Sequence, residues 1–183
     1  MKHRTGTSHG ASSPLLWHTV SFYDDASAHV RSLQDLVRTG LDAGHAVIII
    51  ATQPHRDGID LGLGPRHAQA VADGALVMLD AEETLASFTV GGRVNRRLFR
   101  ERVGSLIQDC LQRFPAVDAY GEMVALLWDR DEVEAALELE TMWNGLHRSL
   151  PFKLHCAYPV PDASLHPLLS PHAPACSLHN AVI

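Results

Sequence analysis

Residues 18–51 have the order strand, loop, helix, strand, and the loop lacks glycine. A nucleotide-binding α/β protein places a glycine-rich phosphate loop at this first turn, with a lysine for the phosphates and a serine or threonine for magnesium. Here the turn is Tyr23-Asp24-Asp25, and the only two lysines, Lys2 and Lys153, do not follow a glycine at the start of a helix. The sequence therefore indicates a P-loop-like scaffold without P-loop catalysis, and it favours a sensing or scaffolding role over an enzymatic one.

Strand and helix patterns alternate along the whole chain. We expect strands at 18–22, 46–50, 75–79, 117–121 and 153–158, a loop at 53–58, and helices at 26–42, 66–72, 94–113, 122–128, 132–150 and 173–182. This alternation predicts an α/β three-layer sandwich with a mostly parallel central sheet. The length suits a single domain at 15–183, after a flexible tail at 1–14 that is rich in serine, threonine, glycine and histidine.

The composition narrows the possible partners and the location. The net charge of −6 argues against direct binding of nucleic acid, and the arginines between residues 93 and 102 are interleaved with apolar residues, as on a solvated helix face. No apolar run is long enough to span a membrane, and the basic N-terminus is not followed by the apolar segment of a signal peptide. Three cysteines without a secretion signal indicate a cytoplasmic protein.

A ligand site is expected beyond the carboxyl ends of the strands. Ligands of parallel α/β sheets bind in the crevice at that edge. The residues that we expect to bind a ligand there are Tyr23, Asp24, Gln53, Asp80, Glu122 and Met123. For Glu122 two interpretations stay open: a hydrogen bond to a polar ligand, or an N-terminal cap of the following helix.

Glu140 is an acidic residue on an otherwise apolar helix face. Val133, Ala136, Trp143 and Leu146 mark that face by their spacing. A carboxylate in such a place needs a partner or becomes neutral. Glu140 could line a pocket with Trp143, or it could form a structural ion pair with an arginine such as Arg148.

Metal, cofactor and nucleophile motifs give little support for catalysis. Adjacent strand residues point to opposite faces, so His155 and Cys156 do not make a ligand pair, and Cys176-x-x-His179 is at most half of a zinc site. The sequence therefore predicts no metal, no cofactor and no catalytic residue. We interpret His18, at the start of the first strand, as a structural hydrogen-bonding residue.

Several segments taken together resemble a known family. They are His18-Thr-Val-Ser-Phe-Tyr-Asp-Asp25, Asp80-Ala-Glu-Glu-Thr-Leu85, Tyr120-Gly-Glu-Met-Val-Ala-Leu-Leu-Trp128, Ala136-Leu-Glu-Leu-Glu140 with Trp143, and Cys156-Ala-Tyr-Pro159. Over about residues 15–183 the chain resembles the MEDS family of methanogen/methylotroph sensory domains. The resemblance implies a RecA/KaiC-like fold without a working P-loop, used for signal input. It also implies sensing of small molecules such as hydrocarbon derivatives, beside histidine kinases, anti-sigma-type ATPases or transcription regulators.

The leading hypothesis is a non-catalytic cytoplasmic sensory domain that binds a small-molecule effector and regulates a separate signalling protein. The alternative is a pseudo-ATPase interaction module that binds no ligand. A third reading is an enzyme that uses Glu122 and a histidine as acid and base. An apolar pocket with few polar groups favours the sensor, and a filled or absent pocket favours the interaction module. A histidine paired with a carboxylate favours the enzyme.

Overall fold

A single parallel sheet organises the protein. The computed structural model describes residues 18–160 and 181–182. The sheet contains β1 (His18–Tyr23), β2 (Ala46–Ala51), β3 (Leu76–Asp80), β6 (Val117–Gly121), β7 (Lys153–Pro159) and the two-residue β8 (Ala181–Val182). Their order is β3-β2-β6-β7-β1-β8, and every neighbouring pair is parallel.

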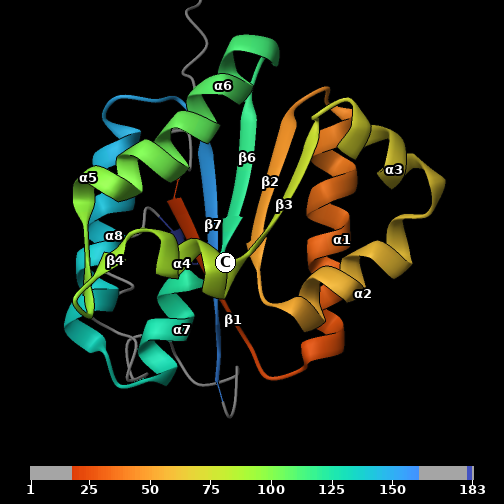
Figure 1. Ribbon diagram of the computed structural model, residues 1–183. Helices are drawn as coiled ribbons and strands as arrows, with labels where there is room; N and C mark the ends of the chain where they lie inside the picture. Colours follow the sequence, from red (N-terminus) through yellow and green to blue (C-terminus); the bar gives the residue numbers. More distant parts are fainter. Residues whose placement is uncertain (1–17, 161–180, 183) are drawn as a thin grey trace, which may run out of the picture.

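Helices cover both faces of this sheet, as Figure 1 shows. One face carries α1 (Ala26–Asp42), α2 (Gln53–Leu63) and α3 (Pro65–Ala72). The other face carries α4 (Ala81–Ser87), α5 (Arg96–Phe99), a π-helical turn (Arg100–Gly104), α6 (Ser105–Arg113), α7 (Met123–Asp129) and α8 (Val133–His147). The predicted three-layer α/β architecture with a mostly parallel sheet is confirmed.

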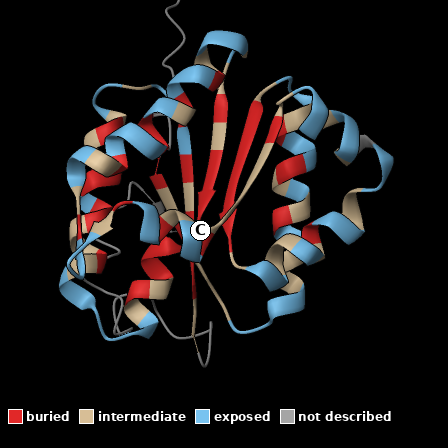
Figure 2. Cartoon of the chain, in the orientation of Figure 1, coloured by how far each residue is buried: buried red, intermediate tan, exposed pale blue. Residues whose placement is uncertain are grey.

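The interior strand β2 is buried along its whole length, as Figure 2 shows. Its side chains alternate between the two apolar clusters of the core: Ile48 and Ile50 pack toward α6, α7 and α8, whereas Val47 and Ile49 pack toward α1. A strand that is covered on both faces is apolar at every position. The unbroken apolar run at 46–50 therefore predicts the strand correctly.

Helix α1 begins and ends where the sequence predicts. The Asp25 carboxylate accepts hydrogen bonds from the backbone N–H groups of Ser27 and Ala28, at 2.8 and 3.1 Å. After the helix, Gly44 takes a φ of +74°, a value that favours glycine at a helix end. Leu33 and Val37 form the buried stripe.

Residues 53–58 are helical, so the predicted loop at this position is wrong. Pro54 lies in the first turn of α2, where a proline fits because the backbone N–H there has no partner within the helix. Gly58 lies inside α2, and a Cβ at that position would come within 2.8 Å of the Val30 side chain on α1. The glycine therefore permits close packing of two helices, whereas the sequence pattern suggested a turn.

A short hairpin separates α4 from α5. The strands β4 (Thr89–Val90) and β5 (Arg93–Val94) are antiparallel, and Gly91 and Gly92 both have positive φ at the turn. The helix predicted from residue 94 therefore starts at Arg96, after the cap residue Asn95, which accepts a hydrogen bond from Leu98 N–H. Arginines 96, 97, 100 and 102 are exposed, which confirms the solvated helix face.

The predicted helix at 173–182 is wrong at its end, because Ala181 and Val182 pair with β1 as strand β8. Residues 173–180 and the predicted tail at 1–14 lie outside the described residues. Within the described ranges, no helix is long and apolar enough to cross a membrane.

The side chain of Trp143, on the inner face of α8, lies in the core, as predicted. Its exposed fraction is 1%, and the Phe99 ring meets it edge-on with the centroids 5.0 Å apart. Val133 was also expected on the buried face, but it is 38% exposed because it begins the helix. The buried stripe of α8 thus starts at Ala136.

Replacing Trp143 by alanine should lower the free energy of unfolding by about 3–5 kcal/mol, because a large ring leaves a cavity in a packed core. The measurement is denaturant unfolding of the full chain. Val133→Ala on the same helix is the matched control and should change stability by less than about 0.5 kcal/mol. Equal effects of the two substitutions would contradict the placement of Trp143.

Candidate functional site

A polar cluster lies where β2 and β6 end side by side. The chain leaves β2 into α2 on one face of the sheet and leaves β6 into α7 on the opposite face. Neighbouring strands whose connections diverge in this way form a topological switch point, the usual ligand crevice of an open α/β sheet. The backbone N–H of Glu122 donates to the carbonyl of Ile50, so Glu122 is fixed directly beside the end of β2.

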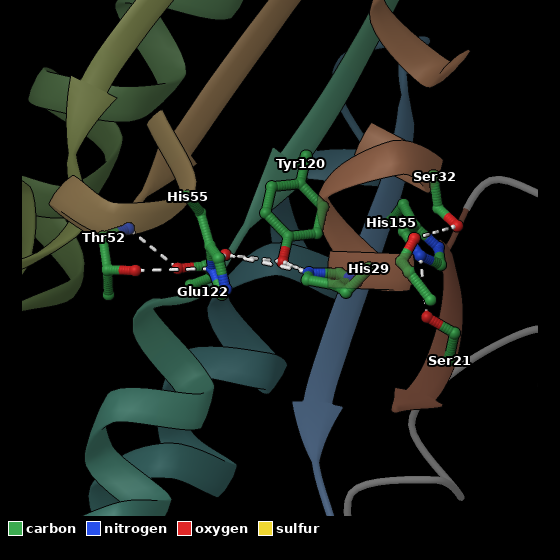
Figure 3. Close-up of polar contacts among 9 residues, drawn as sticks. Ser21, His29, Ser32, Thr52, His55, Tyr120, Glu122 and His155 are labelled. Carbon is green, nitrogen blue, oxygen red and sulfur yellow. Dashed lines mark hydrogen bonds and ion pairs between the residues drawn. The ribbon is translucent and has the colours of Figure 1, made fainter. Parts of the chain in front are cut away.

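The Glu122 carboxylate is the centre of this cluster, although its residue is only 4% exposed. Its Oε2 accepts a hydrogen bond from the backbone N–H of Thr52 at 2.7 Å. Its Oε1 accepts from His55 Nδ1 at 2.6 Å and from the Tyr120 hydroxyl at 2.8 Å (Figure 3). A buried carboxylate requires such donors, and the start of α2 and the end of β6 supply them.

His29 and Tyr23 extend the cluster toward β1. The Tyr120 hydroxyl has one proton, which goes to Glu122, so the contact of 2.7 Å between this hydroxyl and His29 Nε2 requires that the imidazole donates. The ring of Tyr23 stacks on the ring of His29, with centroids 3.9 Å apart and planes 3° from parallel. We call Tyr23, His29, His55, Tyr120 and Glu122 the carboxyl-edge cluster.

Local sequence explains why these side chains meet. Tyr120 and Glu122 are two residues apart at the end of β6, so their side chains lie on the same side of the sheet. His29 lies one turn into α1, and His55 lies in the first turn of α2. Both helices start at the carboxyl edge on the same face, which brings the two imidazoles within 5.1 Å of each other, measured between ring centroids.

The surroundings of the cluster determine the protonation states of its carboxyl group and its two phenol groups. Burial acts to raise the pKa of Glu122, but the neighbouring imidazoles and the Thr52 N–H lower this pKa to about 2. Burial, with Glu122 as the nearby negative charge, raises the pKa of the Tyr23 and Tyr120 hydroxyls. At neutral pH the cluster therefore contains one anionic carboxylate and two neutral phenols.

The six residues predicted to bind a ligand do not all meet. Glu122 and Tyr23 belong to the cluster, and Asp24 is exposed just after β1. Gln53 is exposed on α2, where its amide donates to Asp57 and its carbonyl accepts from Arg56. The remaining two residues are Asp80, which caps α4 and pairs with Arg56 at 2.7 Å, and Met123, which is fully buried among apolar side chains on the opposite face.

Sequence reasoning missed His29, His55 and Tyr120. His29 lies within a helix, and the strand-end rule nominates only residues just after strands. His55 lies two residues beyond Gln53, in the segment that was taken for a loop. The sequence does contain a signal for Tyr120. Side chains alternate along a strand, so a residue two positions before Glu122 is expected to point to the same side of the sheet as Glu122.

A second polar cluster is buried on the α8 face. Glu140 has no exposed surface; its Oε1 accepts from the Tyr158 hydroxyl at 2.7 Å, and its Oε2 lies 3.3 Å from His18 Nε2. His18 Nδ1 donates to the side-chain amide oxygen Oδ1 of Asn144 at 3.0 Å, and Cys156 Sγ lies 3.5 Å from His18 Nε2. The predicted burial of Glu140 is confirmed. Its contacts among the described residues include a histidine and a tyrosine, and the alternative of an ion pair with Arg148 is not formed there.

This environment keeps Glu140 neutral. Burial raises the pKa of Glu140 to about 8, and the hydrogen bond from Tyr158 acts in the opposite direction. Asn144 Oδ1 can only accept, so His18 donates from Nδ1, and its Nε2 faces Glu140 as an acceptor. A protonated Glu140 can therefore donate to His18 inside the core.

Among the residues that the structure describes, two groups of side chains have the donor atoms for a metal ion. They are His29, His55 and Glu122 in the carboxyl-edge cluster, and His18, Glu140 and Cys156 on the α8 face. In each group the three donor atoms lie within 4.8 Å of one another.

A cavity of about 440 Å³ opens beside α1, over the face of the sheet that α1 covers. Its walls include the apolar side chains of Leu33, Leu36 and Ala119, together with polar groups from Thr19, His29 and His155. The charged residues Asp35, Asp118 and Lys153 also line it. His155 bonds Thr19 and Ser21 at 3.0 Å each (Figure 3). None of the six predicted ligand residues lines this cavity, and His29 belongs both to its wall and to the carboxyl-edge cluster.

The fold defines the class of the protein as a three-layer α/β domain with a parallel sheet. The family model of the MEDS domain, described as the methanogen/methylotroph, DcmR sensory domain, matches residues 17–173. The chain therefore belongs to the MEDS family and is a sensory domain. No curated protein matches the chain.

The two shifted groups on α8 predict how stability depends on pH. Between pH 4.5 and 8 a protonated Glu140 makes the folded state bind more protons, so rising pH lowers stability. Burial lowers the pKa of His147 from 6.5 to about 4, which gives the opposite slope between pH 4 and 6.5. The two slopes oppose each other below about pH 6.5. Above it, rising pH should lower the free energy of unfolding through Glu140 by about 1 kcal/mol per pH unit, with the slope fading as the pH approaches 8.

The check is denaturant unfolding between pH 6.5 and 8 for the natural chain and for Glu140→Gln. The substitution should remove most of the fall in stability over this interval. Glu138→Gln, on the more exposed side of the same helix, should keep it. A fall that persists in Glu140→Gln would show that another group causes it.

Proposed function

We propose that this sensory domain binds a small, largely apolar molecule in the cavity beside α1 and reports its presence to a separate signalling protein. The observation that supports this most directly is the cavity itself. Its volume of about 440 Å³ lies within the range of ligand pockets, which are mostly apolar with a few well-placed polar groups. Hydrocarbon derivatives, the class of effector that the family resemblance implies, match such a lining.

His29 offers a physical connection from the cavity to the rest of the domain. It donates to Tyr120, Tyr120 donates to Glu122, and Glu122 holds the backbone N–H of Thr52 at the start of α2. An effector that moves the His29 ring would therefore act on the first turn of α2. A ligand shifts such an equilibrium only by its different affinity for the two states. In this proposal Tyr23 and Glu122 act on effector binding by holding His29 in place.

We further propose that the scaffold is P-loop-like, in the RecA/KaiC manner, and has lost its phosphate site. The first N–H groups of α1 are those that would meet a phosphate at a helix N-terminus. Here the Asp25 carboxylate already accepts hydrogen bonds from two of them. A carboxylate at this position also repels a triphosphate. The partner is then a histidine kinase, an anti-sigma-type protein or a transcription regulator whose output this domain controls without ATP turnover.

The interaction module without ligand is the alternative, and the apolar cavity argues against it. One observation favours a third candidate: His55 and Glu122 lie 2.6 Å apart, which is the arrangement of an acid–base pair. All three donors to Glu122 are groups of the protein, which suits a structural carboxylate. Mass spectrometry of a bound molecule before and after incubation distinguishes the sensor from the enzyme. A sensor releases the molecule unchanged, whereas an enzyme converts it.

Filling the cavity should abolish effector binding. Leu36 lines the cavity, and Leu36→Trp places an indole in the space that the ligand needs. Molecules that co-purify with the natural chain are identified by mass spectrometry, and a panel of short-chain alcohols, aldehydes and haloalkanes is tested by protein NMR. We expect at least a tenfold loss of affinity in Leu36→Trp, because the ligand loses most of its buried contacts.

The matched control is Leu61→Trp on α2, where the natural leucine is 89% exposed. It should bind the same molecules with unchanged affinity. The proposal of an effector site beside α1 fails if no molecule of this class binds, or if Leu36→Trp binds as well as Leu61→Trp.

ATP hydrolysis should be absent. Asp25 occupies the start of α1, and the chain has no lysine at that helix. Phosphate release from ATP in the presence of magnesium should stay at the level of a protein-free sample. Turnover that disappears in Glu122→Gln would contradict this prediction, whereas weak nucleotide binding without turnover would not.

A further inference from the structure

We propose that His29, His55 and Glu122 form a binding site for a divalent transition metal ion, with zinc as the ion that these donors suit best. Two imidazoles and one carboxylate are a frequent ligand set for zinc, and three protein ligands leave a fourth position for water or another molecule. This inference does not depend on the proposed effector site. It rests on the arrangement of three side chains that the sequence pattern did not connect.

The donor atoms have suitable separations. His55 Nδ1 lies 2.6 Å and His29 Nε2 lies 3.9 Å from Glu122 Oε1, and all three atoms lie within 4.8 Å of one another. Ligand atoms at about 2.0–2.2 Å from a tetrahedral zinc ion are roughly 3.3–3.6 Å apart. The separation of 2.6 Å between His55 and Glu122 is shorter than this range, and that of 3.9 Å between His29 and Glu122 is longer. An ion therefore fits after small movements of the side-chain ends.

Surrounding groups hold two of the three donors, Glu122 and His29, in place. Glu122 is oriented by the Thr52 N–H and the Tyr120 hydroxyl, and His29 is oriented by the stacked ring of Tyr23. Such outer contacts are what gives a metal site its geometry. The three donors come from α1, from α2 and from the end of β6, so a bound ion would join these elements at the switch point.

The imidazoles can become ligands without losing their only proton. In the metal-free arrangement His55 donates from Nδ1 to Glu122, and His29 donates from Nε2 to Tyr120. When the ion takes these two nitrogens, exchange with solvent moves the proton of each ring to its other nitrogen, so each ligating imidazole is neutral. The ion thereby replaces the hydrogen bond of 2.6 Å between His55 and the carboxylate with two coordination bonds.

The second group of donors is less suitable. His18, Glu140 and Cys156 are at most 1% exposed, so an ion would have to enter through the packed core. In the carboxyl-edge cluster the His55 side chain is 14% exposed, which gives an ion a route from solvent. We therefore assign the site to the carboxyl edge, and the Cys156 group becomes a control.

The experiment uses the full chain after treatment with a chelator. Zinc is titrated in competition with a chromophoric chelator for the natural chain, His55→Asn and Glu122→Gln. His45→Asn is the matched control, because His45 also pairs with a carboxylate, Asp118 at 2.7 Å, outside any group of three donors. Histidines elsewhere in the chain contribute equally to all four proteins, and circular dichroism with thermal melting shows that each variant is folded.

We expect one zinc site whose affinity falls by about 100-fold or more in His55→Asn and Glu122→Gln and stays unchanged in His45→Asn. Tyr120→Phe should bind about tenfold more weakly and keep the same stoichiometry, since it removes only an orienting contact. Cobalt substituted for zinc should show ligand-field bands without a thiolate charge-transfer band, and Cys156→Ser should leave the spectrum unchanged.

The proposal is overturned if the natural chain binds no zinc, or if His55→Asn binds it as tightly as His45→Asn. A thiolate band that disappears in Cys156→Ser would assign the ion to the α8 face and would also overturn it. If Glu122→Gln does not fold, His55→Asn still decides the question, because its side chain lies at the edge of the site and contributes no backbone contact.

Discussion

The buried carboxylate of Glu122 joins the elements at the ends of β2 and β6, where the chain leaves the two strands toward opposite faces of the sheet. A carboxylate with almost no exposed surface is unfavourable unless donors surround it. Its donors are the backbone at the start of α2, the His55 side chain and the Tyr120 hydroxyl, and His29 on α1 is connected through Tyr120. The cost of burying one charge is thus offset by contacts that fix the relative positions of α1, α2 and β6. Removal of a single donor would leave this charge poorly compensated.

A comparison of the two buried glutamates shows how the environment sets their charge. Glu122 accepts three hydrogen bonds and has two imidazoles nearby, and its pKa falls to about 2. Glu140 is buried more completely and accepts one hydrogen bond from Tyr158, and its pKa rises to about 8. The same residue type therefore serves as a fixed anion on one face of the sheet and as a neutral, proton-donating group on the other. Burial acts in the same direction at both sites, and at Glu122 the hydrogen bonds and the nearby imidazoles outweigh it.

The sequence predicted the fold much better than the site. Apolar periodicity located α1 and β2 almost to the residue, because both bury long, regular apolar faces. It failed at 53–58, where Gly58 serves close helix packing and the local composition resembles a turn. The strand-end rule found Tyr23 and Glu122, which follow the backbone direction of the sheet. It could not find His29 and His55, because their positions depend on how two helices pack on one face, and this information is spread over many residues.

The carboxyl edge of this domain differs in charge from a nucleotide site on a similar scaffold. A nucleotide site needs free N–H groups and positive side chains to meet phosphate. Here Asp25 occupies the N–H groups at the start of α1, and Glu122 places a second carboxylate at the neighbouring strand end. Negative charge in a partly buried crevice repels phosphate and attracts cations. The same negative charge therefore accounts for two features together: the first N–H groups of α1 bond the Asp25 carboxylate, and imidazoles gather around the carboxylate of Glu122.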